Sequence, residues 1–131
     1  MKVIKSFPPN YDEICKVFPI AGIKTIVFTY GDTLYRPGRS GAVPGHLDAH
    51  ERTHTRQQGN DPAGWWKRYL VDKEFRLSQE VEAYRNQYRF FKSKNHNIKE
   101  QINFLDMIAY DLSSEMYGNL VTKEEAKKII I

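Results

Sequence analysis

The sequence predicts an α+β protein that is mainly helical, with a short strand or hairpin ahead of its first long helix. Residues 23–30 are rich in β-branched and aromatic side chains, which is typical of a strand. From residue 44 onward, apolar side chains recur at intervals of three and four positions, which indicates helices. The chain has 131 residues, enough to bury one hydrophobic core, so we expect one domain over residues 1–131.

The composition is ordinary for a globular protein, with 40% hydrophobic and 27% charged residues. No apolar run is long enough to span a bilayer, and the N-terminus lacks the apolar core of a signal peptide, so we expect a cytoplasmic protein without a membrane partner. The single cysteine, Cys15, excludes an internal disulfide and a zinc site built on several thiolates. The net charge of +4 is too small to select a class of partner.

Short elements joined by loops are predicted for the N-terminal third. Residues 1–22 form an entry segment in which three prolines surround a short helical stretch. Residues 23–30 are the predicted strand, and the Gly-Asp turn that follows leads into residues 33–35, which would complete a hairpin. Residues 36–45 contain three glycines and two prolines, so this segment is predicted to be a loop.

Two helical segments follow this loop. Pro44 fits the first turn of the first helix, and Gly59 fits its C-terminal cap. The second pattern runs from about residue 63 to residue 91, with a break near residues 71–74.

Two further helices are predicted in the C-terminal part of the chain. The first covers about residues 98–116, and its apolar stripe consists of Ile102, Leu105, Ile108, Ala109 and Leu112. Thr122 and Glu125 have the spacing of a capping box, which indicates the start of a short last helix. This last helix is expected to bury Ala126, Ile129 and Ile130.

One segment indicates a specific chemistry. Residues 50–54 read His-Glu-Arg-Thr-His, which is an H-E-x-x-H motif. Side chains four positions apart lie one above the other on a helix, so His50 and His54 can bind a single zinc ion. Glu51 lies beside them and can act as a general base on water. The motif therefore predicts a zinc-dependent hydrolase.

A catalytic zinc ion needs a third protein ligand, which must come from another segment. The metzincin pattern is excluded, because Gln57 and Asn60 occupy the positions of its glycine and its final histidine. A carboxylate on a following helix is the alternative, and Glu80 and Glu82 are the best candidates.

Helical spacing favours Glu80 as the ligand. Glu82 points toward Arg85 and Arg89, where a solvated ion pair is expected. A carboxylate on a buried face is costly unless it is paired or bound to metal, and the alternative is a rim position for Glu80 in contact with water. Glu80 shares its predicted face with apolar and aromatic side chains only, namely Leu77, Val81, Tyr84, Tyr88 and Phe91.

The segments H-E-R-T-H and E-V-E-A-Y resemble the gluzincin metallopeptidases, whose ligand glutamate is followed at the third and fourth positions by alanine and aspartate. The resemblance covers about residues 43–91 and implies a minimal zincin-like domain in which Glu80 binds zinc and Ala83 packs toward the motif helix. Tyr84 replaces the aspartate that orients a zinc-binding histidine, and its hydroxyl is expected to accept an imidazole N–H instead. The layout is also similar to small zincin-like proteins of tailed phages, which implies a virion-associated phage protein.

The resulting hypothesis is a zinc metallopeptidase that hydrolyses a peptide or protein substrate, with Glu51 as general base. The predicted strand over residues 23–30 is the expected edge for an extended peptide. A domain of this size offers a shallow cleft, which a homo-oligomer or a larger assembly would complete. The donor for the oxyanion is left open among Tyr69, Tyr84, Tyr88, Tyr110 and His96.

Two other functions fit the sequence. One is a structural or assembly protein in which zinc only staples the helices, which would require a fourth ligand. His46 is the candidate for that ligand, although a rim or capping role is favoured for it. The other is a nucleic-acid-binding module based on Arg85, Arg89 and Lys92. Such a charge run is usually a solvated face, so nucleic acid is the least favoured partner.

Overall fold

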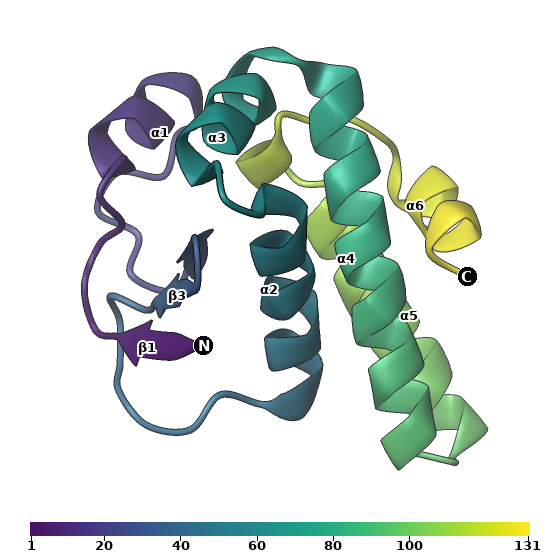
Figure 1. The fold of residues 1–131 in the computed structure, drawn as a ribbon. Helices are drawn as coiled ribbons and strands as arrows, with labels where there is room; N and C mark the ends of the chain where they lie inside the picture. Colours follow the sequence, from purple (N-terminus) through teal and green to yellow (C-terminus); the bar gives the residue numbers. More distant parts are fainter.

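The computed structural model describes residues 1–131 and consists mainly of helices (Figure 1). Six α-helices and one 3-10 helix accompany three short strands, so the predicted mainly helical α+β class is confirmed. None of the helices combines the length and apolar character that a bilayer crossing requires. In chain order the elements are β1 (Lys2–Ile4), α1 (Tyr11–Val17), β2 (Phe28–Tyr30), β3 (Thr33–Tyr35), α2 (Gly45–Gln58), α3 (Pro62–Val71), α4 (Lys73–Lys94), α5 (Ile98–Leu112), η1 (Glu115–Tyr117) and α6 (Lys123–Ile130).

The three strands form one small mixed sheet in the order β1-β3-β2. β1 runs parallel to β3, whereas β2 runs antiparallel to it with Thr29 opposite Leu34. The predicted hairpin of β2 and β3 is confirmed, and Gly31 in its turn has a φ of 63°, which glycine adopts without strain.

Only part of the predicted strand over residues 23–30 forms, because β2 begins at Phe28. Its only neighbour, β3, ends at Tyr35 and is soon followed by Pro37, which lacks the N–H needed to extend the ladder. Without a partner strand, residues 23–27 are irregular, and Ile23 is 42% exposed. The prediction of a strand was therefore wrong for these residues.

Helix α2 lies between the sheet and the long helix α4 (Figure 1) and packs against β2, α3 and α4. It starts directly after Pro44 and ends at Gly59, whose φ of 55° suits the predicted glycine cap. None of its fully buried side chains is apolar, which is unusual for a helix at the centre of a fold. The buried residues are His50, Glu51, Thr53, His54 and Gln58.

Asp72 separates α3 from α4, as expected from the predicted break near residues 71–74. Its backbone is extended, and its carboxylate accepts a hydrogen bond of 3.0 Å from the backbone N–H of Phe75. This N-cap starts α4 in a new direction, so that α3 and α4 pack against each other and both contact α2.

Helix α5 ends at Leu112, earlier than predicted, because the chain turns there into the 3-10 helix η1. Its predicted apolar stripe is correct except at Ile102, which is 61% exposed. Phe104 is buried in the core beside the rest of the stripe. The predicted helical spacing therefore held, but the buried face is rotated away from Ile102.

The last helix, α6, opens with the predicted capping box between Thr122 and Glu125. It buries Ala126 and Ile130, as expected, whereas Ile129 is only partly buried.

Buried apolar side chains form two clusters, one on either side of α2. The first cluster is built by α4, α5 and α6, and the second by α1, the segment after it, β2 and α3. The polar side chains that α2 buries therefore lie in the seam between two apolar clusters.

The buried face of α5 can be tested by a pair of matched substitutions. Ile108 is 0% exposed, so we expect Ile108→Ala to lower the free energy of unfolding by about 2–5 kcal/mol. Ile102→Ala should change it by no more than about 0.5 kcal/mol, since this side chain is exposed. Urea unfolding measures both values, and similar losses in the two variants would contradict the assigned face.

Candidate metal centre

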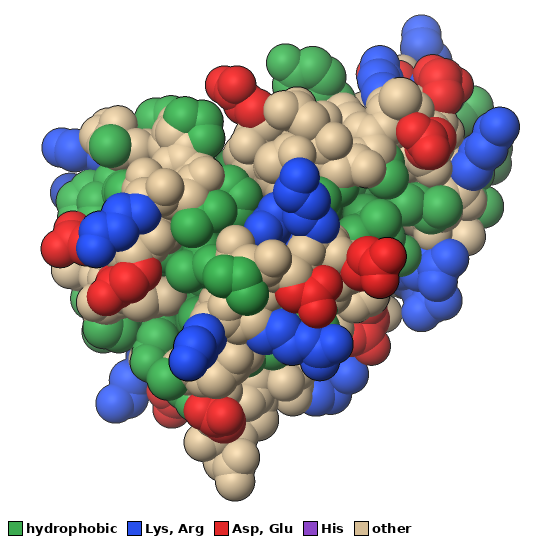
Figure 2. All heavy atoms as spheres, turned by 90° about the horizontal axis from the view of Figure 1, so that it is seen from above, with side chains coloured by type: hydrophobic (Ala, Val, Ile, Leu, Met, Phe, Trp, Pro, Cys, Tyr) green, Lys and Arg blue, Asp and Glu red, His purple; other side chains and the backbone are tan.

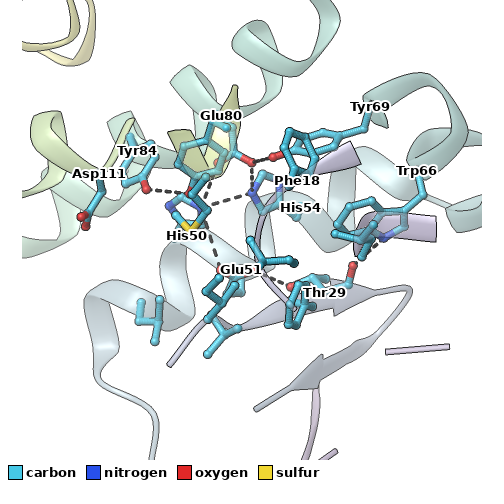
Figure 3. Close-up of a pocket in the computed structure, with 18 of the residues that line it drawn as sticks. Phe18, Thr29, His50, Glu51, His54, Trp66, Tyr69, Glu80, Tyr84 and Asp111 are labelled. Carbon is cyan, nitrogen blue, oxygen red and sulfur yellow. Dashed lines mark hydrogen bonds and ion pairs between the residues drawn. The ribbon is translucent and has the colours of Figure 1, made fainter. Parts of the chain in front are cut away.

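His50 and His54 lie one turn apart on α2 and face each other across a short gap (Figure 3). Their Nε2 atoms are 3.2 Å apart. The ring of Tyr84 packs edge-on against His50 at 4.5 Å between centroids, and Trp65 lies 5.4 Å from His54. These aromatic rings restrict the orientation of both imidazoles.

Glu80 reaches both histidines from helix α4. Its Oε1 lies 3.3 Å from Nε2 of His50, and its Oε2 lies 3.3 Å from Nε2 of His54. The hydroxyl of Tyr69, on α3, donates a hydrogen bond of 2.6 Å to Oε2. Oε1 is buried and accepts no hydrogen bond, which is costly for a carboxylate oxygen unless a cation lies beside it.

The three side chains form a buried group that is able to hold a metal ion. The closest approaches among His50, His54 and Glu80 are 3.2, 3.3 and 3.3 Å. Tetrahedral ligands of a zinc ion, at about 2.0–2.1 Å from the metal, lie about 3.3–3.4 Å from one another. The unpartnered oxygen, the donor types and the spacing thus all fit a metal ion.

Gln57 fixes the tautomer of His54. Its Oε1 lies 2.8 Å from Nδ1 of His54, while its Nε2 donates to the carbonyl of Gln79 at 3.0 Å and to Oε1 of Glu82 at 2.8 Å. Because both of those partners can only accept, the amide oxygen must face the imidazole and accept from Nδ1–H. When His54 loses its second proton, the lone pair is therefore left on Nε2, as metal binding requires.

Gln87 makes a corresponding contact with Nδ1 of His50. Its Oε1 lies 2.9 Å from Nδ1 of His50, and its Nε2 lies 3.0 Å from Nδ1 of His46. The prediction that Tyr84 accepts the imidazole N–H was wrong, because the Tyr84 hydroxyl pairs at 2.7 Å with that of Tyr117 instead. Tyr84 contacts His50 through its aromatic ring, in a T-shaped arrangement.

Glu82 lies apart from the three-residue group. Its carboxylate pairs with Arg56 of α2 at 3.3 Å and accepts from Gln57. The expected pairs with Arg85 and Arg89 are absent, because α2 packs along this side of α4 and brings its own cation closer. Arg85 donates instead to the carbonyl of Ile129 at 2.7 Å.

Burial strengthens the interaction between the charges of the group. Burial by itself would raise the pKa of Glu80, but His54 and the contacts with His50 hold it well below its ordinary value. Burial would lower the pKa of His54, but the charge of Glu80 outweighs it and raises that pKa to about 9. Burial and the neighbouring Glu80 carboxylate raise the pKa of Tyr69, which keeps its hydroxyl a donor.

Glu51 lies next to the group, on the side of strand β2 (Figure 3). The hydroxyl of Thr29 donates a hydrogen bond of 2.5 Å to its Oε2. Its Oε1 lies 3.9 Å from Nε2 of His50. One carboxylate oxygen is thus held by the sheet, and the other is directed toward the histidines.

A cavity of about 330 Å³ connects these side chains. Most of its lining is apolar, and no lysine or arginine is part of it. Besides Glu51 and Glu80, it contains one further carboxylate, that of Asp111 on α5. Burial raises the pKa of Asp111, while the charge of His50 acts in the opposite direction.

Two of the five predicted oxyanion donors, Tyr69 and Tyr84, line this cavity. Tyr88 is packed in the cluster of α4, α5 and α6 and is not part of the cavity lining. Tyr110 is 65% exposed, and His96 is exposed in the loop before α5. None of these three residues lines the cavity.

The residues that hold the site in place were not predicted from the sequence. Gln87 lies seven positions after Glu80 and thus on the same helical face, so helical spacing could have indicated it. Gln57 is three positions after His54, which is also a helical contact distance. Thr29 and Tyr117 gave no such indication, because their contacts join segments far apart in the chain.

Comparison of the chain with protein-family models, with curated proteins and with solved structures finds no match.

The choice between Glu80 and Glu82 can be tested by zinc content. We expect Glu80→Ala to weaken zinc binding by more than the ~10–100-fold typical of losing an outer partner. Glu82→Ala should retain about one zinc per chain, since Glu82 pairs with Arg56 and lies outside the group. Elemental analysis after dialysis measures both, and the opposite pattern would overturn the assignment.

Metal binding should also release a proton. In the metal-free protein the pKa of His54 is about 9, so His54 is protonated at pH 7 and must lose its proton to bind metal. We expect about one proton per zinc at pH 7, falling toward zero above pH 9, with affinity rising over the same range. Calorimetry in buffers of different ionisation enthalpy measures this number, and no release at pH 7 would show that His54 is already neutral.

Proposed function

We propose that the protein is a zinc-dependent peptidase in which His50, His54 and Glu80 hold the metal and Glu51 is the general base. The observation that carries this proposal is the position of Glu51, buried beside the three-residue group without being part of it. Three protein ligands are typical of catalytic zinc, which keeps one position for water or substrate.

The donor types favour zinc among the common metals. Two imidazoles disfavour magnesium and calcium, which prefer oxygen ligands. Two histidines and one carboxylate also bind iron in oxygenases. Glu51, at the general-base position of an H-E-x-x-H motif, supports zinc and hydrolysis over oxygen chemistry.

Bound zinc would polarise the scissile carbonyl and lower the pKa of the attacking water. Glu51 would accept a proton from that water as its oxygen attacks the carbonyl carbon, and would deliver the proton to the amine as the C–N bond breaks. The hydrogen bond from Thr29 holds Oε2 of Glu51, which leaves Oε1 for the water. Thr29 is thus a positioning residue for the base.

The Tyr84–Tyr117 pair is the best-supported donor for the oxyanion. Each hydroxyl carries one proton, and their mutual hydrogen bond of 2.7 Å uses only one of the two. The other proton is free for a substrate oxygen in the cavity, which both residues line. Burial raises the pKa of both hydroxyls, so they stay protonated at neutral pH. Tyr69 is less suitable, since it already donates to Glu80.

An extended substrate would lie along residues 25–27 rather than along the whole of residues 23–30, the edge predicted from the sequence. The carbonyl of Thr29 already accepts hydrogen bonds from Gln58 at 2.8 Å and from Trp66 at 3.0 Å. Residues 25–27 line the cavity and have no partner strand, so their backbone groups are the ones a peptide could pair with.

The resemblance to gluzincins supports the same assignment. In that family an aspartate at the position of Tyr84 orients a zinc-binding histidine. The amide of Gln87, three positions later on the same helix, hydrogen-bonds Nδ1 of His50 instead. The orienting contact is therefore present, although the residue that makes it differs.

A zinc-stapled structural protein is the second candidate, and the deep burial of the site favours it. His50, Glu51, His54 and Glu80 are each 5% exposed or less. A structural zinc site, however, usually has four protein ligands. His46 is not available as the fourth, because the amide of Gln87 lies between it and His50.

A nucleic-acid-binding role has less support. On the face shown in Figure 2, lysine and arginine side chains alternate with acidic ones, so no field of a single sign is formed there. Arg85 and Lys92 of the predicted basic stripe contact their own chain, at the carbonyl of Ile129 and the ring of Tyr88.

The variant Glu51→Gln distinguishes a peptidase from a structural protein that zinc only stabilises. We expect this variant to retain zinc and to lose about 10²–10⁴-fold in kcat, because it cannot accept the proton. Glu74→Gln, at an exposed position of helix α4 and outside the cavity lining, is the matched control and should cleave like the wild type. The readout is cleavage of a diverse peptide pool by mass spectrometry.

Full cleavage by Glu51→Gln would contradict the role of the base. A wild-type protein that cleaves no peptide, but melts at a lower temperature once zinc is removed, would contradict the peptidase and support the staple.

A further inference from the structure

Asp111 is the one carboxylate of the cavity that the proposed mechanism leaves unused. It lies near the end of α5, and Figure 3 places it beside Tyr84, on the opposite side of His50 from Trp66. None of the ion pairs in the protein involves Asp111. The hydrogen bonds that it accepts go to its backbone oxygen. Its carboxylate is half-buried and has no protein partner.

With a divalent ion bound, the cavity would carry one unbalanced negative charge. Glu51 and Glu80 together would balance the charge of a divalent ion, and the cavity lining contains no lysine or arginine. Asp111 then remains as an uncompensated negative charge among mainly apolar side chains. Such a charge is unfavourable by itself and becomes favourable when a cation enters with its own hydrogen-bond donors.

The lining of the cavity also suits a particular shape of ligand. Leu47 and Met116 line the same cavity and offer apolar contact, while the Tyr84–Tyr117 pair offers a hydroxyl. A side chain with an apolar stem and a cationic head would match such walls. A cavity of about 330 Å³ has room for a ligand of roughly this size.

We propose that Asp111 selects substrates that carry an ammonium or guanidinium group close to the scissile bond. This inference rests on the proposed peptidase function and names its substrate class. The cation has two sources with the same chemistry, a lysine or arginine side chain and the free α-amine of a peptide. Asp111 is a specificity-determining residue, and its side chain makes no ion pair with the general base or with the metal ligands.

Calorimetry on the zinc-loaded wild-type protein tests this without requiring turnover. Three hydroxamates serve as probes: N-acetyl-lysine hydroxamate has a cationic side chain, norleucine hydroxamate has a free α-amine, and N-acetyl-norleucine hydroxamate has neither. We expect one of the two cationic probes to bind about tenfold tighter or more than the neutral one. The probe that does so identifies the source of the cation.

Asp111→Asn keeps the shape of the side chain and should abolish this preference. Glu100→Gln removes a charge from an exposed position of the same helix and should retain it. Equal binding of all three probes, a preference that survives in Asp111→Asn, or no binding of any probe would overturn the proposal. A preference that depends on Asp111 in a protein that cleaves no peptide would uphold the cation site and overturn the peptidase.

Discussion

The central helix α2 buries a polar face, and the elements around it supply the partners of that face. Its fully buried side chains are two imidazoles, a carboxylate, a hydroxyl and an amide. Each such group left without a partner would cost about 1–3 kcal/mol, so the fold has to surround α2 with hydrogen-bonding groups. Strand β2 supplies Thr29 for Glu51, and α4 supplies Gln87 and Glu80 for the histidines. The placement of β2 and α4 on opposite sides of α2 follows from these polar contacts as much as from apolar packing.

The two apolar clusters on either side of this seam give the polar contacts their strength. They keep water away, so the charges of His54 and Glu80 act on each other at low local dielectric, which raises the pKa of His54 to about 9. They also position donors: Tyr69 stacks on Trp65 at 4.8 Å and thereby directs its hydroxyl onto Glu80. In the metal-free protein a proton on His54 balances the carboxylate, and a metal ion would replace that proton.

The parts of the site that the sequence predicted are those carried by a single helix. Helical periodicity brings His50 next to His54 and puts Glu80 on a buried face. The same spacing keeps Glu82 off that face, but its partner, Arg56 of another helix, was not predicted. Contacts between distant segments were not predictable in this way. The partner of Glu51 depends on how the hairpin packs against α2, and the start of β2 depends on where β3 ends. Neither the contact of Thr29 nor the irregular course of residues 23–27 therefore follows from local pattern.

X-ray absorption at the zinc edge of the loaded protein reports the ligands of the metal itself. The proposed ligand set predicts four-coordinate zinc with two imidazole nitrogens at about 2.0–2.1 Å, one carboxylate and one exchangeable oxygen that a hydroxamate displaces. A spectrum with four protein ligands that a hydroxamate leaves unchanged, or one without imidazole scattering, would contradict it.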